Sequence, residues 1–216
     1  MVKKVLAFLL LVIFSGSIAW AAKVIPLPAP NTSSQFSLEE SIAKRRSERE
    51  FQEKTITMNQ LSQLLWAAQG ITDQTFGFRA APSAGSLYPL FIYVAKSDGL
   101  FRYIPDGHKL VQISNQDIRS AMSRAALGQS DIREAPVDII ITANFCITQA
   151  KYGARAFRYV CMEVGHAAEN IQLQAVALGL SSVTVGAFWD DVIRTNLQLP
   201  ETQDPMYIIP IGYLKS

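Results

Sequence analysis

Apolar residues recur with a helical period in the segment that follows Thr57. Thr57 and Gln60 have the spacing of a capping box, which predicts that a helix begins there. Gly70 supplies its end, because glycine is common just after the last helical turn. Between them, apolar positions three or four residues apart define one face of the helix. These positions are Leu61, Leu64, Leu65 and Ala68.

A shorter helix is predicted before it. Ser37 and Glu40 form a second capping-box pair, so a helix should begin at Ser37. Leu38 and Ile42 lie four residues apart, and we expect both to face the core. The helix should end within residues 45–47.

The middle of the chain has the turn residues of an antiparallel meander. Asp98-Gly99 and the Pro-Asp-Gly of residues 105–107 separate short apolar runs. The predicted strands of the meander are 90–96, 100–104 and 109–113. Further strands are predicted at 137–143, 182–185 and 206–211.

Helical patterns return at residues 116–127 and 156–178, the second being the longest helix of the chain. The buried side of the long helix should carry Phe157, Val160, Cys161, Val164, Ala168, Ile171, Ala175 and Leu178. Helices and strands are mixed without a strict strand–helix–strand alternation. This order predicts an α+β layered domain with a mostly antiparallel central sheet flanked by helices.

The composition is that of one folded domain. The 216 residues are 49% hydrophobic and 18% charged, which is enough for a buried core. The formal charge of +2 comes from Lys3 and Lys4, and the other charges balance. Electrostatics therefore do not favour nucleic acid as a partner.

The first residues resemble a secretory signal peptide. Lys3 and Lys4 precede the apolar run 5–14, and residues 19–21 (Ala-Trp-Ala) fit a small-x-small cleavage pattern. We expect export to the periplasm or the exterior, with no stable membrane insertion after cleavage. An uncleaved anchor is the alternative, because residues 5–22 are about long enough to span a bilayer.

The domain organisation follows from this pattern. The predicted parts are a signal peptide over 1–22, a linker rich in proline and polar residues over 23–35, and a folded domain over 36–216. Cys146 and Cys161 fit neither a zinc spacing nor a disulfide-rich scaffold, and two separately buried thiols are expected, with a disulfide left open.

Three guanidinium groups lie close together near the end of the first helix. Arg45, Arg46 and Arg49 surround Ser47. Arginine matches phosphate oxygens two at a time, so this segment is a candidate phosphate site. The alternative is a solvated basic helix end that complements the helix dipole.

Two other segments carry candidate site residues. Residues 81–86 are small, which lets backbone N–H groups approach a ligand closely. Lys151 and Tyr152 are adjacent, and an ammonium beside a phenol makes the phenol a better base. The alternatives are an ordinary connecting loop and a surface turn.

A metal site is not predicted. Glu163, His166 and Glu169 are spaced by three residues on the long helix, a pattern that binds metal when a second helix supplies partners. His108 is the only other histidine, and it lies in a predicted turn. We therefore expect His166 to be an ordinary helix histidine.

The order and spacing of these motifs resemble the nitroreductase superfamily, and within it the SagB-type dehydrogenases, which include azoline oxidases. The resemblance covers residues 41–213. The matching segments are RRSEREF at 45–51, PSAGSLYP at 82–89, KYGAR at 151–155, GHAAEN at 165–170 and PIGY at 210–213.

The resemblance implies a homodimer with two FMN molecules at its interface. In this family the arginine segment holds the phosphate and ribityl groups, a small-residue loop comes from the partner subunit, and a glycine lies near flavin N5 and O4. The matching cofactor residues here are Arg45, Arg46, Ser47, Arg49, Pro82, Ser83, Ala84, Gly85 and Gly186. Lys151 and Tyr152 match the pair proposed to act in azoline oxidation.

Three features depart from the family pattern. Lys215 is the one basic residue left beyond the last strand for the phosphate. Val185 precedes Gly186, where simple nitroreductases often carry glutamate. Azoline oxidases normally work in the cytoplasm with a cyclising partner, whereas this chain begins with a predicted export signal.

The sequence thus predicts an exported FMN-dependent oxidoreductase. It would pass a hydride between a small or peptide-derived substrate and flavin N5, with an electron donor or acceptor that the sequence does not identify. The alternatives are a nitro or quinone reductase of the same superfamily and a non-catalytic flavin-binding module.

Overall fold

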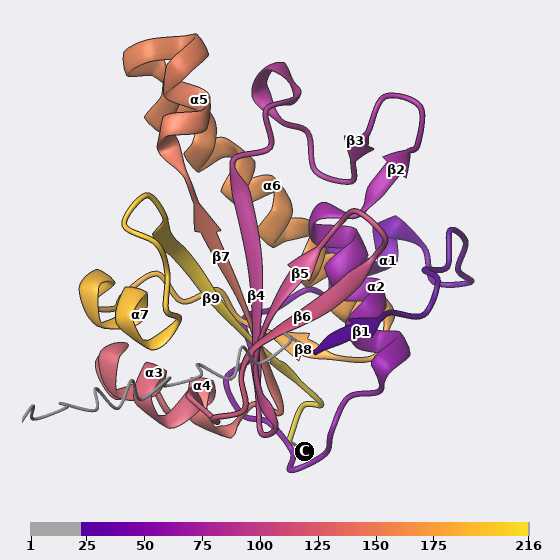
Figure 1. Ribbon diagram of the computed structural model, residues 1–216. Coiled ribbons are helices and arrows are strands. Elements are labelled where there is room, and N and C mark those ends of the chain that lie inside the picture. The colour runs from indigo at the N-terminus through magenta and orange to yellow at the C-terminus, as the bar shows by residue number, and fades with distance from the viewer. Residues whose placement is uncertain (1–22, 216) are drawn as a thin grey trace, which may run out of the picture.

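A computed structural model describes residues 23–215, which build two β-sheets and a set of helices (Figure 1). The strands of the large sheet are β1 (Val24–Pro26), β4 (Leu90–Lys96), β5 (Gly99–Ile104), β6 (Lys109–Ser114), β7 (Val137–Ala143), β8 (Ser181–Ser182) and β9 (Asp204–Gly212). A small hairpin joins β2 (Ile71–Asp73) and β3 (Phe78–Arg79). The α-helices are α1 (Leu38–Lys44), α2 (Met58–Gln69), α3 (Arg119–Ala125), α4 (Ser130–Glu134), α5 (Phe145–Tyr152), α6 (Ala156–Ala177) and α7 (Asp190–Asn196), and the 3-10 turns are η1 (Ala84–Ser86) and η2 (Gly153–Arg155).

The large sheet is antiparallel throughout. Its strand order is β1-β6-β5-β4-β7-β9-β8, so β1 and β8 are its edges. Every neighbouring pair runs antiparallel. The predicted meander 90–113 is confirmed as β4, β5 and β6, and the predicted α+β class with an antiparallel sheet is confirmed with it.

Helices cover both faces of the large sheet. The alternation of side chains along β7 shows that a separate core lies on each face. Ile139 and Ile141 belong to the core beneath α2 and α6, whereas Ile140 belongs to the core beneath α3, α4 and α7. All three side chains are buried. Because successive side chains point to opposite faces, a strand buried on both faces is apolar almost without interruption.

The predicted helix between Thr57 and Gly70 is confirmed as α2, together with its capping box. Thr57 accepts from the Gln60 backbone, and the Gln60 side chain accepts from the Thr57 backbone. The apolar stripe of α2 is buried, and α6 packs beside it.

The prediction that Leu38 and Ile42 of α1 face the core is wrong. Ser37 caps the helix as expected, but Leu38 and Ile42 are exposed and only Ser41 is buried. The same correction applies to Phe157 of α6, whose exposed ring stacks on Phe145 at 5.7 Å. An apolar period identifies a helix face, but it does not say whether the chain's own core or another surface covers that face.

Other segments also differ from the expectation. The predicted linker includes the edge strand β1, whose Val24–Pro26 pairs with β6. The predicted helix 116–127 is shorter, as α3, and is followed by α4. Helix α5 was not predicted, since it follows β7 directly and its only local signal is the Asn144 cap, which accepts from the Cys146 backbone at 3.0 Å.

Both cysteines are free, but the prediction that they are buried is wrong. Cys146 is exposed and Cys161 is half-buried. Within residues 23–215, no helix is both long and apolar enough to cross a membrane. The predicted signal peptide lies outside the described residues.

Candidate functional site

The arginine segment runs along the edge strand β8. Ser47 pairs with Ser182, and the Glu48 backbone donates to the Ser182 carbonyl at 3.1 Å. Arg45 approaches Glu169 of α6 at 3.8 Å, a loose ion pair. In the part of the chain that the structure describes, Arg46 and Arg49 form no ion pair. The segment therefore keeps positive charge available for an anion.

Gly186 lies at the same edge of the sheet, four residues after Ser182. Val185 pairs with Ile208 of β9 through two backbone bonds of 2.8 and 3.0 Å, and its side chain is buried. Gly186 is the exposed point at which the chain leaves the sheet. A Cβ there would lie 3.4 Å from the Tyr207 ring, an ordinary contact distance, so this ring borders the surface at Gly186.

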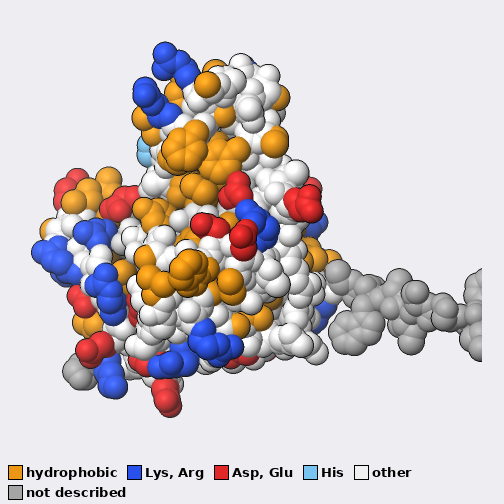
Figure 2. Space-filling model, turned by 90° about the vertical axis from the view of Figure 1, so that its left-hand side faces the viewer, with side chains coloured by type: hydrophobic (Ala, Val, Ile, Leu, Met, Phe, Trp, Pro, Cys, Tyr) orange, Lys and Arg blue, Asp and Glu red, His pale blue; other side chains and the backbone are white. Residues whose placement is uncertain are grey.

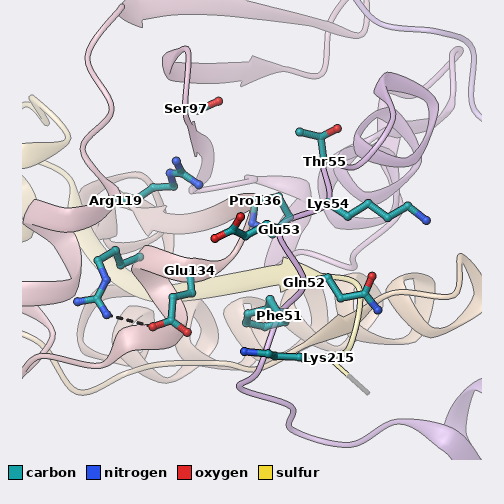
Figure 3. A pocket seen from close by; sticks show the side chains of 11 residues that line it. Phe51, Gln52, Glu53, Lys54, Thr55, Ser97, Arg119, Glu134, Pro136 and Lys215 are labelled. Carbon is teal, nitrogen blue, oxygen red and sulfur yellow. Dashed lines mark hydrogen bonds and ion pairs between the residues drawn. The ribbon is translucent and has the colours of Figure 1, made fainter.

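Lys215 joins this edge through its backbone. Its N–H donates to the Glu50 carbonyl at 3.0 Å, one residue beyond Arg49. Its side chain lines a cavity of about 830 Å³, where Figure 3 shows it stretched alongside Phe51. Arg119 in this cavity is paired with Asp117. Arg45, Ser47 and Arg49 do not line the cavity, so the Lys215 side chain is set apart from theirs.

A second cluster forms where α5 ends. Figure 1 shows α5 and the loop that contains η1 at the top of the molecule. A Cβ at Gly85 would lie 2.7 Å from the Tyr152 hydroxyl oxygen and 2.8 Å from Lys151 Nζ. Gly85 has φ +63, which glycine adopts without strain. A side chain at this position would displace the ends of the Lys151 and Tyr152 side chains.

Lys151 and Tyr152 are the last two residues of α5, and the chain turns at Gly153 before α6. The Lys151 ammonium lies 5.5 Å from the centre of the Tyr152 ring, and the edge of the Tyr159 ring packs against Tyr152 at 5.1 Å. The structure thus unites two predicted motifs, the small-residue loop and the Lys-Tyr pair, within one chain.

A buried carboxyl supports this second cluster. Glu163 of α6 accepts a hydrogen bond of 2.6 Å from the Ser83 hydroxyl. Burial raises the pKa of Glu163 to about 7, against the smaller opposing effects of the Ser83 hydrogen bond and the Arg79 charge. Sequence reasoning considered Glu163 only as a metal ligand, and its spacing from Ser83 in the sequence held no signal of this contact.

The two clusters face different sides of α6. Glu163 supports the small-residue loop, and Glu169 approaches Arg45. Glu163 and Glu169 are six residues apart, which corresponds to about 9 Å along the helix and a rotation of about 240° around its axis. Pro82, Ser83, Ala84 and Gly85 therefore belong with Lys151 and Tyr152, whereas the arginine segment, Gly186 and the Lys215 backbone belong together at the β8 edge.

The protein is therefore an α+β domain with a basic segment at one sheet edge and a glycine loop against a Lys-Tyr pair. The chain belongs to the nitroreductase family, whose model, described as "Nitroreductase family", matches residues 42–213. Members of this family generally bind flavin, as FMN.

Known relatives agree with this assignment. A nitroreductase homologue of Methanocaldococcus jannaschii is 44% identical over 184 residues, covering 82% of this chain and 91% of the relative. The crystal structure of a nitroreductase homologue from Ralstonia eutropha has a TM-score of 0.82 at 31% identity, covering 89% of this chain and 90% of that one. The Escherichia coli microcin synthetase complex contains a chain with the same fold, with a TM-score of 0.70 at 20% identity, covering 86% and 76%.

Proposed function

We propose that this oxidoreductase uses FMN. Arg45, Ser47 and Arg49 would hold its phosphate and ribityl groups, and Gly186 would leave room beside the ring. The fit rests on the charge of Arg49, which has no ion-pair partner in residues 23–215, on the loose 3.8 Å pair that Arg45 forms with Glu169, and on the exposed position of Gly186. When bound, the flavin would supply the hydride transfer, which amino-acid side chains do not provide.

We further propose that the site is shared between two copies of the chain. Its two clusters lie on different sides of α6, so one copy would contribute the arginine edge and the other the loop with Lys151 and Tyr152. Exposed apolar residues support this arrangement, among them Phe157 and Met162 of α6. Figure 2 shows apolar side chains gathered in a band across the face that it presents. A face of this kind marks an interaction surface.

Within the shared site, the proposed role of Tyr152 is to accept a proton from the substrate, while Lys151 stabilises the phenolate. The support for this role is that the Tyr152 hydroxyl and the Lys151 ammonium both lie close to Gly85. The Tyr152 hydroxyl and the Lys151 ammonium both reach the backbone at Gly85, so a small or peptide-derived substrate that approaches Tyr152 would also meet Lys151. This chemistry is that of the SagB-type dehydrogenases.

A reductase acting on nitro compounds or quinones is the second candidate. The relative that is 44% identical bears the nitroreductase name, which favours this activity. Such a reductase needs only a flavin and an open face for the acceptor. Lys151 and Tyr152 would then only shape the entrance of the site.

The substitution Tyr152→Phe separates the two candidates. It keeps the ring and removes the hydroxyl, so dehydrogenation should fall by about 10²–10⁴ if Tyr152 accepts the proton. The purified protein should be yellow, its extracted flavin should be FMN, and the variant should keep the same flavin content. The assays are oxidation of a thiazoline peptide and NADPH-driven reduction of menadione and a nitrofuran.

The matched control is Tyr159→Phe, since Tyr159 packs against Tyr152 and loses only a hydroxyl. It should keep the parent rate. Thiazoline oxidation at the parent rate in Tyr152→Phe would remove the proton-acceptor role. Reduction of menadione or the nitrofuran alone, unchanged in both variants, would establish the reductase. A colourless protein that does not bind added FMN would refute both candidates.

The location of the protein is proposed to be outside the cytoplasm. The support is the signal-like composition of residues 1–22, which lie outside the described residues. Fractionation of the source cells and mass spectrometry of the N-terminus would test it. Full-length protein in the cytosol would refute export.

A further inference from the structure

Glu163 has a position that its role in helix α6 does not explain. Its side chain is 2% exposed, and its Oε2 atom accepts from the Ser83 hydroxyl at 2.6 Å. Its Oε1 atom is buried and has no hydrogen-bond partner among residues 23–215. A buried carboxyl is costly unless its oxygens are used, so a helix needing only to pack would carry an apolar residue here.

The hydrogen bond between Ser83 and Glu163 holds a turn, residues 83–88, in which several residues have a positive φ. Gly85, Ser86 and Tyr88 have φ values of +63, +55 and +50. For residues other than glycine such values are uncommon and must be held by the surroundings. Ser83 holds this turn through two hydrogen bonds. Its hydroxyl accepts from the Tyr88 backbone at 2.9 Å, and its carbonyl accepts from the Ser86 backbone at 3.0 Å.

Arg79 closes the other side of the turn. Its backbone N–H donates to the Tyr88 hydroxyl at 3.1 Å, and its guanidinium lies 4.5 Å from the centre of the Tyr88 ring. The guanidinium also donates to Gln69 of α2 at 3.0 Å. The turn is therefore held to α2 by Arg79 and to α6 by Glu163, with Gly85 between them at Lys151 and Tyr152.

We propose that Glu163 is a positioning residue, which fastens the 83–88 turn to α6 through Ser83 and thereby sets the distance between Gly85 and the Lys151-Tyr152 pair. The role in the reaction rests on the proposed function, but the fastening itself does not. Glu163 acts through Ser83 and needs no contact with the substrate. Among the other charged residues of its helix, His166 and Glu169 are exposed, so a metal site shared with Glu163 is not supported.

Hydrogen exchange of the backbone amides tests the fastening without any substrate. In Glu163→Leu the side-chain volume is kept and the acceptor is lost, so the Ser86 and Tyr88 amides should exchange about tenfold to a hundredfold faster. Glu163→Gln keeps an acceptor oxygen for the Ser83 hydroxyl and should restore protection to within a few-fold of the parent. Ser83→Ala also removes the acceptor of the Tyr88 amide, so the two variants are compared at the Ser86 amide, whose acceptor is the Ser83 carbonyl. There Ser83→Ala should match Glu163→Leu, and the double variant should add little, because both changes remove the contact between Ser83 and Glu163.

The control is Glu201→Gln, an exposed glutamate in the turn before β9, which should leave exchange unchanged. Parent-like protection in Glu163→Leu would overturn the proposal, and so would equal loss of protection in the Gln and Leu variants. A melting curve for each variant confirms that the fold is kept, and if Glu163→Leu does not fold, exchange of the Ser86 amide in Ser83→Ala decides.

A kinetic measurement then connects the turn to the site. With menadione or the thiazoline peptide, whichever the parent turns over, Glu163→Leu should lower kcat about tenfold or more at unchanged flavin content, and Glu163→Gln should stay close to the parent. An unchanged kcat in Glu163→Leu would refute the positioning role. A protein without activity towards either compound would refute the proposed function while the exchange result still stands.

Discussion

Buried ionisable residues make the stability of this protein depend on pH, and Glu163 is one of them. Its pKa of about 7 lies above the ordinary value of 4.5, because burial disfavours the charged carboxylate. A raised folded-state pKa means that the folded protein holds this proton more tightly than the unfolded chain does. The contribution of Glu163 to stability is therefore full below about pH 4.5 and is lost as the pH rises to about 7.

Glu163→Gln removes this titration. The free energy of unfolding of the variant, relative to the parent, should rise between pH 4.5 and 7 by an amount on the order of 3 kcal/mol and then level off. Urea unfolding at several pH values measures it. Glu201→Gln, on an exposed turn, is the reference. A difference from the parent that stays constant across this range would contradict the effect assigned to burial of the carboxyl.

At the scale of elements, a chain of hydrogen bonds joins three parts of the fold that are distant in sequence. Tyr103 of β5 lies 2.8 Å from His108 Nδ1, and Ser62 of α2 lies 2.6 Å from His108 Nε2. Ser62 also donates to the Pro28 carbonyl. Because the single Ser62 proton is used there, His108 Nε2 donates to Ser62. In the neutral ring, Nδ1 then accepts from the Tyr103 hydroxyl. A neutral His108 thus holds the segment after β1 against α2 and the β5–β6 turn.

Acid should weaken this connection. Burial lowers the pKa of His108 below its ordinary value of 6.5, so the folded protein favours the neutral ring. The stability contributed by that ring is full above about pH 6.5 and is lost as the pH falls through the lowered folded-state pKa. In His108→Asn, the asparagine tolerates the positive φ of +42 at this position, and its side chain does not titrate.

The parent protein should therefore lose more stability than His108→Asn as the pH falls from 6.5 to 5. Thermal melting across this range measures the difference. His166→Asn is the matched control, since it removes the other histidine, which is exposed on α6, and should follow the parent. Parallel curves for the parent and His108→Asn would show that His108 does not contribute.

At the scale of the whole molecule, the site would be complete only in a dimer. One copy holds its arginine edge and its Lys-Tyr cluster on different sides of α6, and exposed apolar residues lie on α1 and α6. Flavin binding and association should then strengthen one another, because a ligand that binds only the dimer stabilises the dimer by mass action.

Met162→Glu should break this association. A charge at the exposed Met162 position would be desolvated in the proposed interface, so the variant should sediment as a monomer and lose most of its flavin. Val24→Glu, a change at an exposed apolar position on the edge strand β1, is the control and should keep both. A monomer of the parent protein that binds FMN tightly at nanomolar concentration would contradict the shared site.

The sequence by itself determined the elements whose signals are local. The Thr57 capping box, the stripe of α2 and the turns of the meander depend on neighbouring residues, and the structure has each of them where the pattern predicts. The order of short motifs predicted the nitroreductase family, which the family comparison confirms, whereas the SagB-type branch stays a proposal.

Only the tertiary structure decided which motifs meet. Gly85 contacts Lys151 and Tyr152, Ser47 pairs with Ser182, and Ser83 donates to Glu163 across 80 residues. No local pattern specifies such pairs, because they depend on how helices and strands pack. The same reason explains the exposed Leu38 and Ile42, since a periodic apolar face does not reveal which surface will cover it.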